Sequence, residues 1–159
     1  MLGSRAIAQT NNNNDTSFFL NAIQDASPND DRYLKAKVTV RGLELNADLA
    51  VTQEQMSKGL AVKDELKENE SMLFVFGEPS RHSFWMKDMK FPIDIIWLDN
   101  NGTVVYIKNS LQPCIMTFAF LCPTYTPDKD SLYVLETGSG FSKKHGIKIG
   151  THADFQLIS

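Results

Sequence analysis

Two acidic residues lie among apolar residues, where a carboxyl group could do chemistry. Asp94 alternates onto the same strand face as Ile96 and Leu98, so the sequence predicts that its carboxyl is partly buried. A buried charge is costly unless it has a partner, and the predicted partner is Lys87 on the preceding segment. The preferred interpretation of Asp94 is a structural ion pair or a cap on a backbone turn. The functional alternative is the polar floor of a ligand pocket.

Glu136 ends the run LYVLE and could join Asp94 in such a pocket. Paired carboxyl groups divide acid and base roles in glycoside hydrolysis, so a hydrolase of undetermined reaction stays open as an alternative function. Aromatic residues around Trp97 favour core packing, and the alternative is that they form flat walls for a ligand. The candidate ligand-binding residues are Trp85, Lys87, Asp94, Tyr125 and Glu136.

Cys114 and Cys122 are the two cysteines of the chain, eight positions apart and each beside a proline. A disulfide formed in an oxidising compartment is the preferred interpretation. Two ordinary buried thiols are the second. A catalytic thiolate is the least favoured, because no adjacent His or Lys would lower the thiol pKa.

Charge and histidine spacing argue against several classes of function. His82, His145 and His152 show no paired-ligand spacing, so the sequence predicts no metal site, and no motif predicts a cofactor. The chain has 16 basic and 19 acidic residues, a net charge of -3, and no cationic cluster larger than Lys143–Lys144. We therefore expect no nucleic-acid binding. No apolar run approaches the ~20 residues of a membrane span.

Apolar periodicity predicts a mostly β, α+β fold. Residues 35–50 alternate about Gly42 as a hairpin does, and Thr52 with Gln55 forms a predicted capping box that opens a short helix. Asn101-Gly102 predicts a second hairpin. We expect one compact mixed, mainly antiparallel β-barrel or rolled sheet with two short helices. Further strands are predicted at 72–76, 83–86, 93–98, 104–107 and 132–136, and the second helix at 141–145.

The predicted domain covers residues 33–159, after a disordered or remnant leader at 1–32 that contains polar runs. Within the leader, Phe18 to Ile23 predict either a short helix docked on the domain or a degraded export segment. The first residues resemble the end of a secretion signal, and an ordinary disordered start is the alternative. An extracytoplasmic location is therefore expected, with a cytoplasmic one left open.

Several motifs in one order resemble the family called domain of unknown function 192, over roughly residues 37 to 157. That resemblance implies a compact, β-rich, barrel-like domain, often preceded by an export signal or membrane anchor. It implies no reaction, cofactor or substrate. The motifs are Gly59-Leu60, MLFVF at 72–76, FWMK at 84–87, PIDII at 92–96, Pro113-Cys114, CPTY at 122–125, VLE at 134–136 and His145-Gly146-Ile147 with Gly150.

Two segments depart from the family pattern. Ile115 to Leu121 is apolar where similar sequences have a short polar stretch, which predicts different packing, a lid or self-association through this loop. The tail at 150–154 lacks the usual Gly-Asp, so no role of that Asp is carried over. We expect a small exported ligand-binding or accessory module with an unknown small-molecule or protein partner. Whether it is an enzyme is left open.

Overall fold

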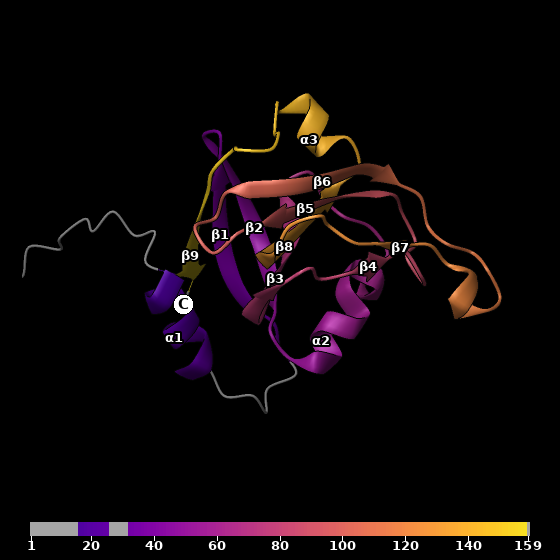
Figure 1. The fold of residues 1–159 in the computed structure, drawn as a ribbon, viewed down its shortest axis with the longest axis horizontal. Coiled ribbons are helices and arrows are strands. Elements are labelled where there is room, and N and C mark those ends of the chain that lie inside the picture. The colour runs from indigo at the N-terminus through magenta and orange to yellow at the C-terminus, as the bar shows by residue number, and fades with distance from the viewer. Residues whose placement is uncertain (1–15, 26–31, 159) are drawn as a thin grey trace, which may run out of the picture.

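The computed structural model describes residues 16–25 and 32–158, and these residues are mostly β (Figure 1). A seven-stranded sheet has the order β6-β5-β8-β3-β2-β1-β9, and β4 pairs with β7 separately. The strands are β1 Leu34–Val40, β2 Leu43–Ala50, β3 Glu70–Ser80, β4 Phe84–Trp85, β5 Ile93–Leu98, β6 Val104–Leu111, β7 Thr124–Tyr125, β8 Ser131–Gly138 and β9 Ala153–Ile158. The helices are α1 Thr16–Asp25, α2 Gln53–Lys58 and α3 Phe141–Lys144, with 3-10 turns η1 Gly59–Val62 and η2 Ala119–Leu121.

The predicted mostly β, mixed and mainly antiparallel fold is confirmed. Within the described seven-stranded sheet, β2 and β3 run parallel and every other neighbouring pair is antiparallel. Both predicted hairpins are present, as β1 with β2 and β5 with β6. The predicted capping box also forms, because the Gln55 amide donates to the Thr52 side chain and the Gln55 side chain accepts from the Thr52 amide.

The sheet is rolled but is not closed into a barrel, so the barrel alternative is wrong. Its edge strands β6 and β9 approach at one corner, where Thr103 and His152 form an isolated bridge. Gly102 permits this approach, because its φ is +78° and a Cβ there would lie 2.4 Å from the Ala153 carbonyl oxygen. The chain before β9 turns back on itself, with the Thr151 amide bonded to the Lys148 carbonyl. β9 therefore continues beside β1 and not along β6.

Two apolar clusters make up the core, one on each face of the central strands. The first contains Ile96 and Leu135, and the second contains Ile95 and Val134, as alternation along β5 and β8 requires. Both faces of these strands are covered, which explains their continuous apolar runs. The second cluster lies beside α2 and β4, where the candidate pocket is found.

Three α-helices occur among the described residues, one more than predicted. The extra helix, α1, lies in the segment predicted as a leader. Its Phe19 is buried, and the centroid of the Phe19 ring lies 6.2 Å from that of Tyr133 and 5.9 Å from that of Phe155. The alternative of a short helix docked on the domain is thus confirmed. The leader prediction for 1–15 and 26–31 lies outside the described residues. No helix in the described ranges has the length and apolar character needed to cross a membrane.

Candidate functional site

A cavity of about 520 Å³ lies between α2 with η1 on one side and β3, β4 and β8 on the other. Its volume is within the ~300–1,000 Å³ range typical of small-molecule sites. Figure 1 shows α2 next to β4, below the strands of the sheet. The capping box of α2 fixes where that helix begins, so a local sequence signal positions one wall of the cavity.

Aromatic side chains form the opposite wall. The rings of Phe74 and Phe84 meet edge to face with centroids 4.8 Å apart, and the rings of Phe76 and His82 stack at 3.5 Å. The Trp97 indole N–H donates to the His82 carbonyl at 2.8 Å, which fixes this segment over the sheet. Burial lowers the pKa of His82, so its ring is neutral at pH 7. The wall therefore presents uncharged, flat surfaces.

Glu136 lies at the floor of the cavity and is 4% exposed. Among the described residues, its carboxyl has one hydrogen bond, accepted by Oε2 from the Leu60 amide at 3.3 Å. Burial raises the pKa of Glu136 to about 8, and the Leu60 amide offsets this only in part. At pH 7 the carboxyl is therefore mostly neutral. A neutral carboxyl carries an O–H donor as well as an acceptor oxygen.

Gly59 makes room for this floor. Its φ of +49° lies in the left-handed region, and a Cβ there would lie 3.2 Å from Phe74 Cζ and 3.5 Å from Glu136 Oε2. A side chain at this position would be strained and would crowd the ring and the carboxyl together. Gly59 and Leu60 were not among the predicted site residues, although they belong to the motif that carried the family resemblance.

Two lysines and a tryptophan form the rim. Lys58 pairs with Glu54 at 2.5 Å and Lys87 with Asp88 at 2.7 Å, and both lysines line the cavity. Trp85 is 44% exposed and lines both this cavity and an adjoining hollow of about 290 Å³. The rim thus carries two lysine–carboxylate ion pairs, with an aromatic surface between the two hollows.

Of the five predicted ligand-binding residues, the cavity brings together Trp85, Lys87 and Glu136. Tyr125 does not line it and instead pairs with Phe84 across β4 and β7. Asp94 does not line it either and is fully buried on β5.

The predicted pairing of Asp94 with Lys87 is wrong, because Lys87 bonds to Asp88 and Asp94 is held by backbone amides. Asp94 Oδ1 accepts from Ser110 at 2.8 Å and from Gly140 at 3.0 Å. Its Oδ2 accepts from Ser142 at 2.8 Å. The other half of the preferred interpretation, a cap on a backbone turn, is confirmed.

Strand register places Asp94 and Glu136 on opposite faces of the sheet. Asp94 pairs with Thr137 and Ile95 pairs with Glu136. Directly opposed residues share a face and successive residues alternate. The two carboxyl groups therefore do not converge in one cleft, which removes the geometric basis for the two-carboxylate hydrolase.

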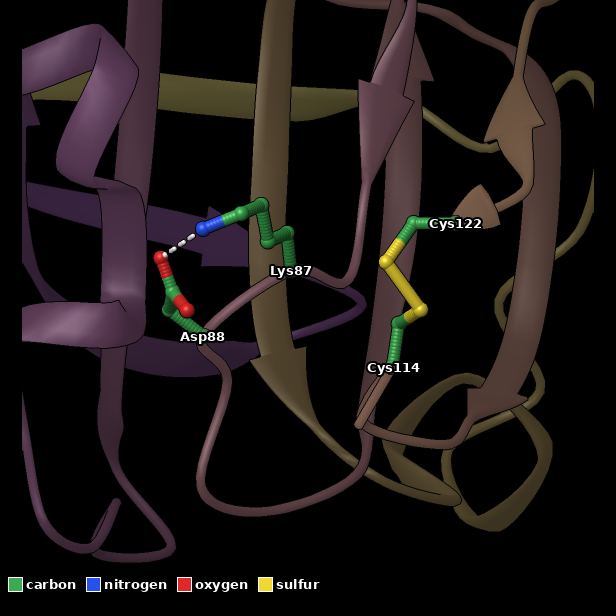
Figure 2. The surroundings of a disulfide bond; sticks show 4 residues. All are labelled: Lys87, Asp88, Cys114 and Cys122. Atoms are coloured by element: carbon green, nitrogen blue, oxygen red, sulfur yellow. Dashed lines mark hydrogen bonds and ion pairs between the residues drawn. A yellow bond between two sulfur atoms is a disulfide. The ribbon is translucent and has the colours of Figure 1, made fainter. Parts of the chain in front are cut away.

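Cys114 and Cys122 form the predicted disulfide, with Cα atoms 5.8 Å apart (Figure 2). The Cys114 amide also donates to the Met86 carbonyl at 3.0 Å, and Cys114 forms an isolated β-bridge with Lys87. These contacts join the chain at Cys114 to the segment that contains Lys87. In Figure 2 the Lys87 side chain extends away from the sulfur atoms toward Asp88. The disulfide is thus next to the pocket rim in the fold but presents no thiol to the pocket.

The part of the chain that the structure describes contains no preorganised metal site. No group of three or more His, Cys, Asp or Glu side chains is arranged there to hold an ion. The polar groups that line the cavity are one buried carboxyl, two rim amines, the His82 imidazole, the Gln53 amide and the hydroxyls of Ser57 and Ser83, beside an aromatic wall.

The fold and the cavity define a class of small proteins built on one rolled, mixed β-sheet with a pocket beside a capped helix. The chain belongs to the domain of unknown function 192 family, described as "Uncharacterized ACR", whose model matches residues 36–155. The family resemblance seen in the sequence is thereby confirmed.

Two solved structures are similar to this chain. One, from Sinorhizobium meliloti 1021, carries the provisional description of a transcription regulator; it is 24% identical with a TM-score of 0.69, over 79% of this chain and 97% of that chain. The other is a protein of unknown function from Novosphingobium aromaticivorans DSM 12444, 27% identical with a TM-score of 0.66, over 80% of this chain and 89% of that chain. Curated proteins give no match.

Proposed function

We propose that this protein is a small ligand-binding module that holds a compact molecule in the cavity above Glu136. The observation that carries the proposal is the isolated, buried Glu136 carboxyl at the floor of a cavity of ligand size. A buried polar group with so few partners is costly to the fold, and a ligand that bonds to it offsets that cost. Perturbed groups of this kind concentrate at functional sites.

The pocket favours a ligand with a flat apolar body and a hydrogen-bond acceptor, such as a sugar derivative or an aromatic carboxylate. The apolar body would lie against Phe74, Phe84 and Trp85, which supply the ring surfaces. The acceptor would accept a hydrogen bond from the carboxyl O–H that Glu136 carries at pH 7. Lys87 at the rim suits a further acceptor or an anionic group on the ligand.

An extracytoplasmic location belongs to the same proposal. The disulfide between Cys114 and Cys122 supports it, because such bonds persist in oxidising compartments. Under this proposal the chain acts as an exported ligand-binding or accessory module.

We do not extend the description of the Sinorhizobium meliloti relative to this chain. At 24% identity that likeness shows a shared fold. The net charge of -3 and the lack of a cationic cluster beyond Lys143–Lys144 give no electrostatic footprint for a nucleic-acid backbone.

The test is a thermal-shift screen of sugars, aromatic carboxylates, small anions and metal ions, since a ligand that binds only the native state raises its melting temperature. We expect a hit whose shift is lost in Trp85→Ala and retained in Ile149→Ala, an exposed apolar control that does not line the cavity. The hit should weaken in the wild type as pH rises through about 8, because Glu136 then loses its donor proton.

Glu136→Gln sharpens the screen, because an amide keeps a donor at every pH. We expect its ligand-induced shift to be nearly the same at pH 6 and pH 9. A screen without hits would contradict the proposal and favour a protein partner or scaffold role. A ligand that raises the melting temperature of Trp85→Ala as much as that of the wild type would bind outside this cavity.

A further inference from the structure

The loop between the two cysteines is apolar and exposed. Residues 115–121 carry no charged side chain, and Ile115 is 92% and Phe120 is 80% exposed. Met116, Phe118 and Leu121 are each more than half exposed. Single exposed apolar residues are ordinary, whereas a contiguous group of five marks a contact surface. The pocket does not use this loop, since none of its residues line the cavity.

The loop is compact and projects from the body of the protein. The disulfide holds its ends 5.8 Å apart between Cα atoms, and the Cys114 amide fastens one end to the Met86 carbonyl. In Figure 1 this orange segment, with its short turn, extends beyond the edge of the sheet on the side of β7. It is therefore a protruding tip and not a flat patch.

Part of the polar backbone of the tip is satisfied internally. The Leu121 amide donates to the Phe118 carbonyl and the Cys122 amide to the Ala119 carbonyl, both at 3.0 Å, within the turn η2. The rings of Phe118 and Phe120 stack with centroids 5.5 Å apart. Internal hydrogen bonds lower the cost of moving backbone into an apolar phase. The tip thus presents side chains more than backbone to its surroundings.

We propose that residues 115–121 insert reversibly into the interface of a lipid bilayer and anchor the protein to its surface. Five exposed apolar side chains on a projecting tip match the shallow burial of interfacial anchors, which reaches ~5–10 Å into the headgroup region. This inference does not depend on the pocket or its ligand.

A bilayer suits the tip better than a second copy of the chain does. A flat protein partner would cover only the side of the tip that faces it, whereas lipid can surround the tip. The absence of Lys and Arg from 115–121 and the net charge of -3 indicate a zwitterionic surface and little dependence on salt.

Flotation of the full chain with phosphatidylcholine vesicles tests the proposal. We expect the wild type to float at low and high salt alike, and the double variant Phe118→Ser, Phe120→Ser to bind at least about tenfold more weakly, because two exposed rings no longer enter lipid. Ile149→Ser is the matched control, since Ile149 is 63% exposed outside the loop, and it should float as the wild type does. Unchanged melting temperatures would show that both variants are folded.

Four outcomes would overturn the proposal. The wild type fails to float with phosphatidylcholine, or the double variant floats as well as the wild type does. Binding restricted to anionic vesicles and abolished by salt would assign the contact to surface charge. Sedimentation equilibrium showing a dimer that the double variant dissociates, without vesicle binding, would assign the loop to a second copy of the chain.

Discussion

Two carboxyl groups on neighbouring strands, Asp94 on β5 and Glu136 on β8, are both buried yet have different surroundings. Asp94 is fully buried and accepts three backbone amides at 2.8 to 3.0 Å. Glu136 is 4% exposed and, within the described chain, accepts one amide at 3.3 Å. Asp94 lies outside the cavity, whereas Glu136 lines it.

The number of donors around each carboxyl accounts for the difference. Asp94 joins the end of β6 to the start of α3. Its carboxylate oxygens accept hydrogen bonds from the Ser110 amide at the end of β6 and from the Gly140 and Ser142 amides at the start of α3. Ser110 has a φ of +50° at this contact. Such a saturated group serves the fold and has little capacity left for a ligand. The Glu136 carboxyl has one hydrogen-bond donor among the described residues and lines a cavity, so it can still form hydrogen bonds with another molecule. The comparison therefore makes Glu136, and not Asp94, the candidate for contact with a ligand.

The largest effect is expected from Asp94→Ala. The substitution leaves three amides without their acceptor, and each buried unsatisfied group costs ~1–3 kcal/mol, so the free energy of unfolding should fall by about 3–5 kcal/mol. Urea denaturation measures this loss. Asp94→Asn keeps one acceptor oxygen and should lose less. A loss below ~1 kcal/mol for the Ala variant would show that Asp94 is not the structural member of the pair.

A smaller effect is expected from Gly59→Ala, which crowds the other carboxyl. The new Cβ would lie 3.2 Å from Phe74 Cζ in a backbone conformation that non-glycine residues rarely adopt. We expect the free energy of unfolding to fall by ~1–3 kcal/mol and any ligand-induced thermal shift to shrink. Gly42→Ala is the matched control, because the φ of Gly42 is also positive, at +77°, while a Cβ there meets no atom within 4 Å. Equal behaviour of the two variants would contradict a tight pocket floor.

Much of the fold was predictable because its signals are local. Alternation about Gly42 and the Thr52–Gln55 capping box each involve residues close in sequence, and both were predicted correctly. The alternation of Asp94 also predicted its burial. The sequence left a barrel and a rolled sheet as alternatives, because closure depends on where β9 turns away from β6, at a contact between Thr103 and His152 that no local pattern encodes.

The candidate site was less predictable, because its contacts join distant residues. Leu60 and Glu136 are 76 positions apart, and the amides that hold Asp94 come from 16 to 48 positions away. Opposite charge and a place on the preceding segment predicted Lys87 as the partner of Asp94, but backbone amides at a turn bond to the carboxyl instead. Residue type and alternation predict that a carboxyl is buried. They do not show which donors meet it or whether a cavity lies beside it.

A buried carboxyl with one hydrogen bond, such as Glu136, must make the stability of the fold depend on pH. The free energy of unfolding of wild type and Glu136→Gln between pH 4 and pH 9 measures this dependence. The folded pKa of about 8 is above the ordinary value of 4.5, so the unfolded chain releases this proton first as pH rises. The contribution of the neutral carboxyl is therefore fully present below pH 4.5 and is lost as pH rises through 8.

We expect the free energy of unfolding of the wild type to fall by a few kcal/mol relative to that of Glu136→Gln as pH rises from 4.5 to about 8. Above this range the difference between the two proteins should be constant. Glu65→Gln is the control, because it changes an exposed carboxyl, and its free energy of unfolding should vary with pH as that of the wild type does. Parallel curves for wild type and Glu136→Gln at every pH would show instead that Glu136 titrates alike in the folded and unfolded chain, and that burial does not hold its carboxyl neutral.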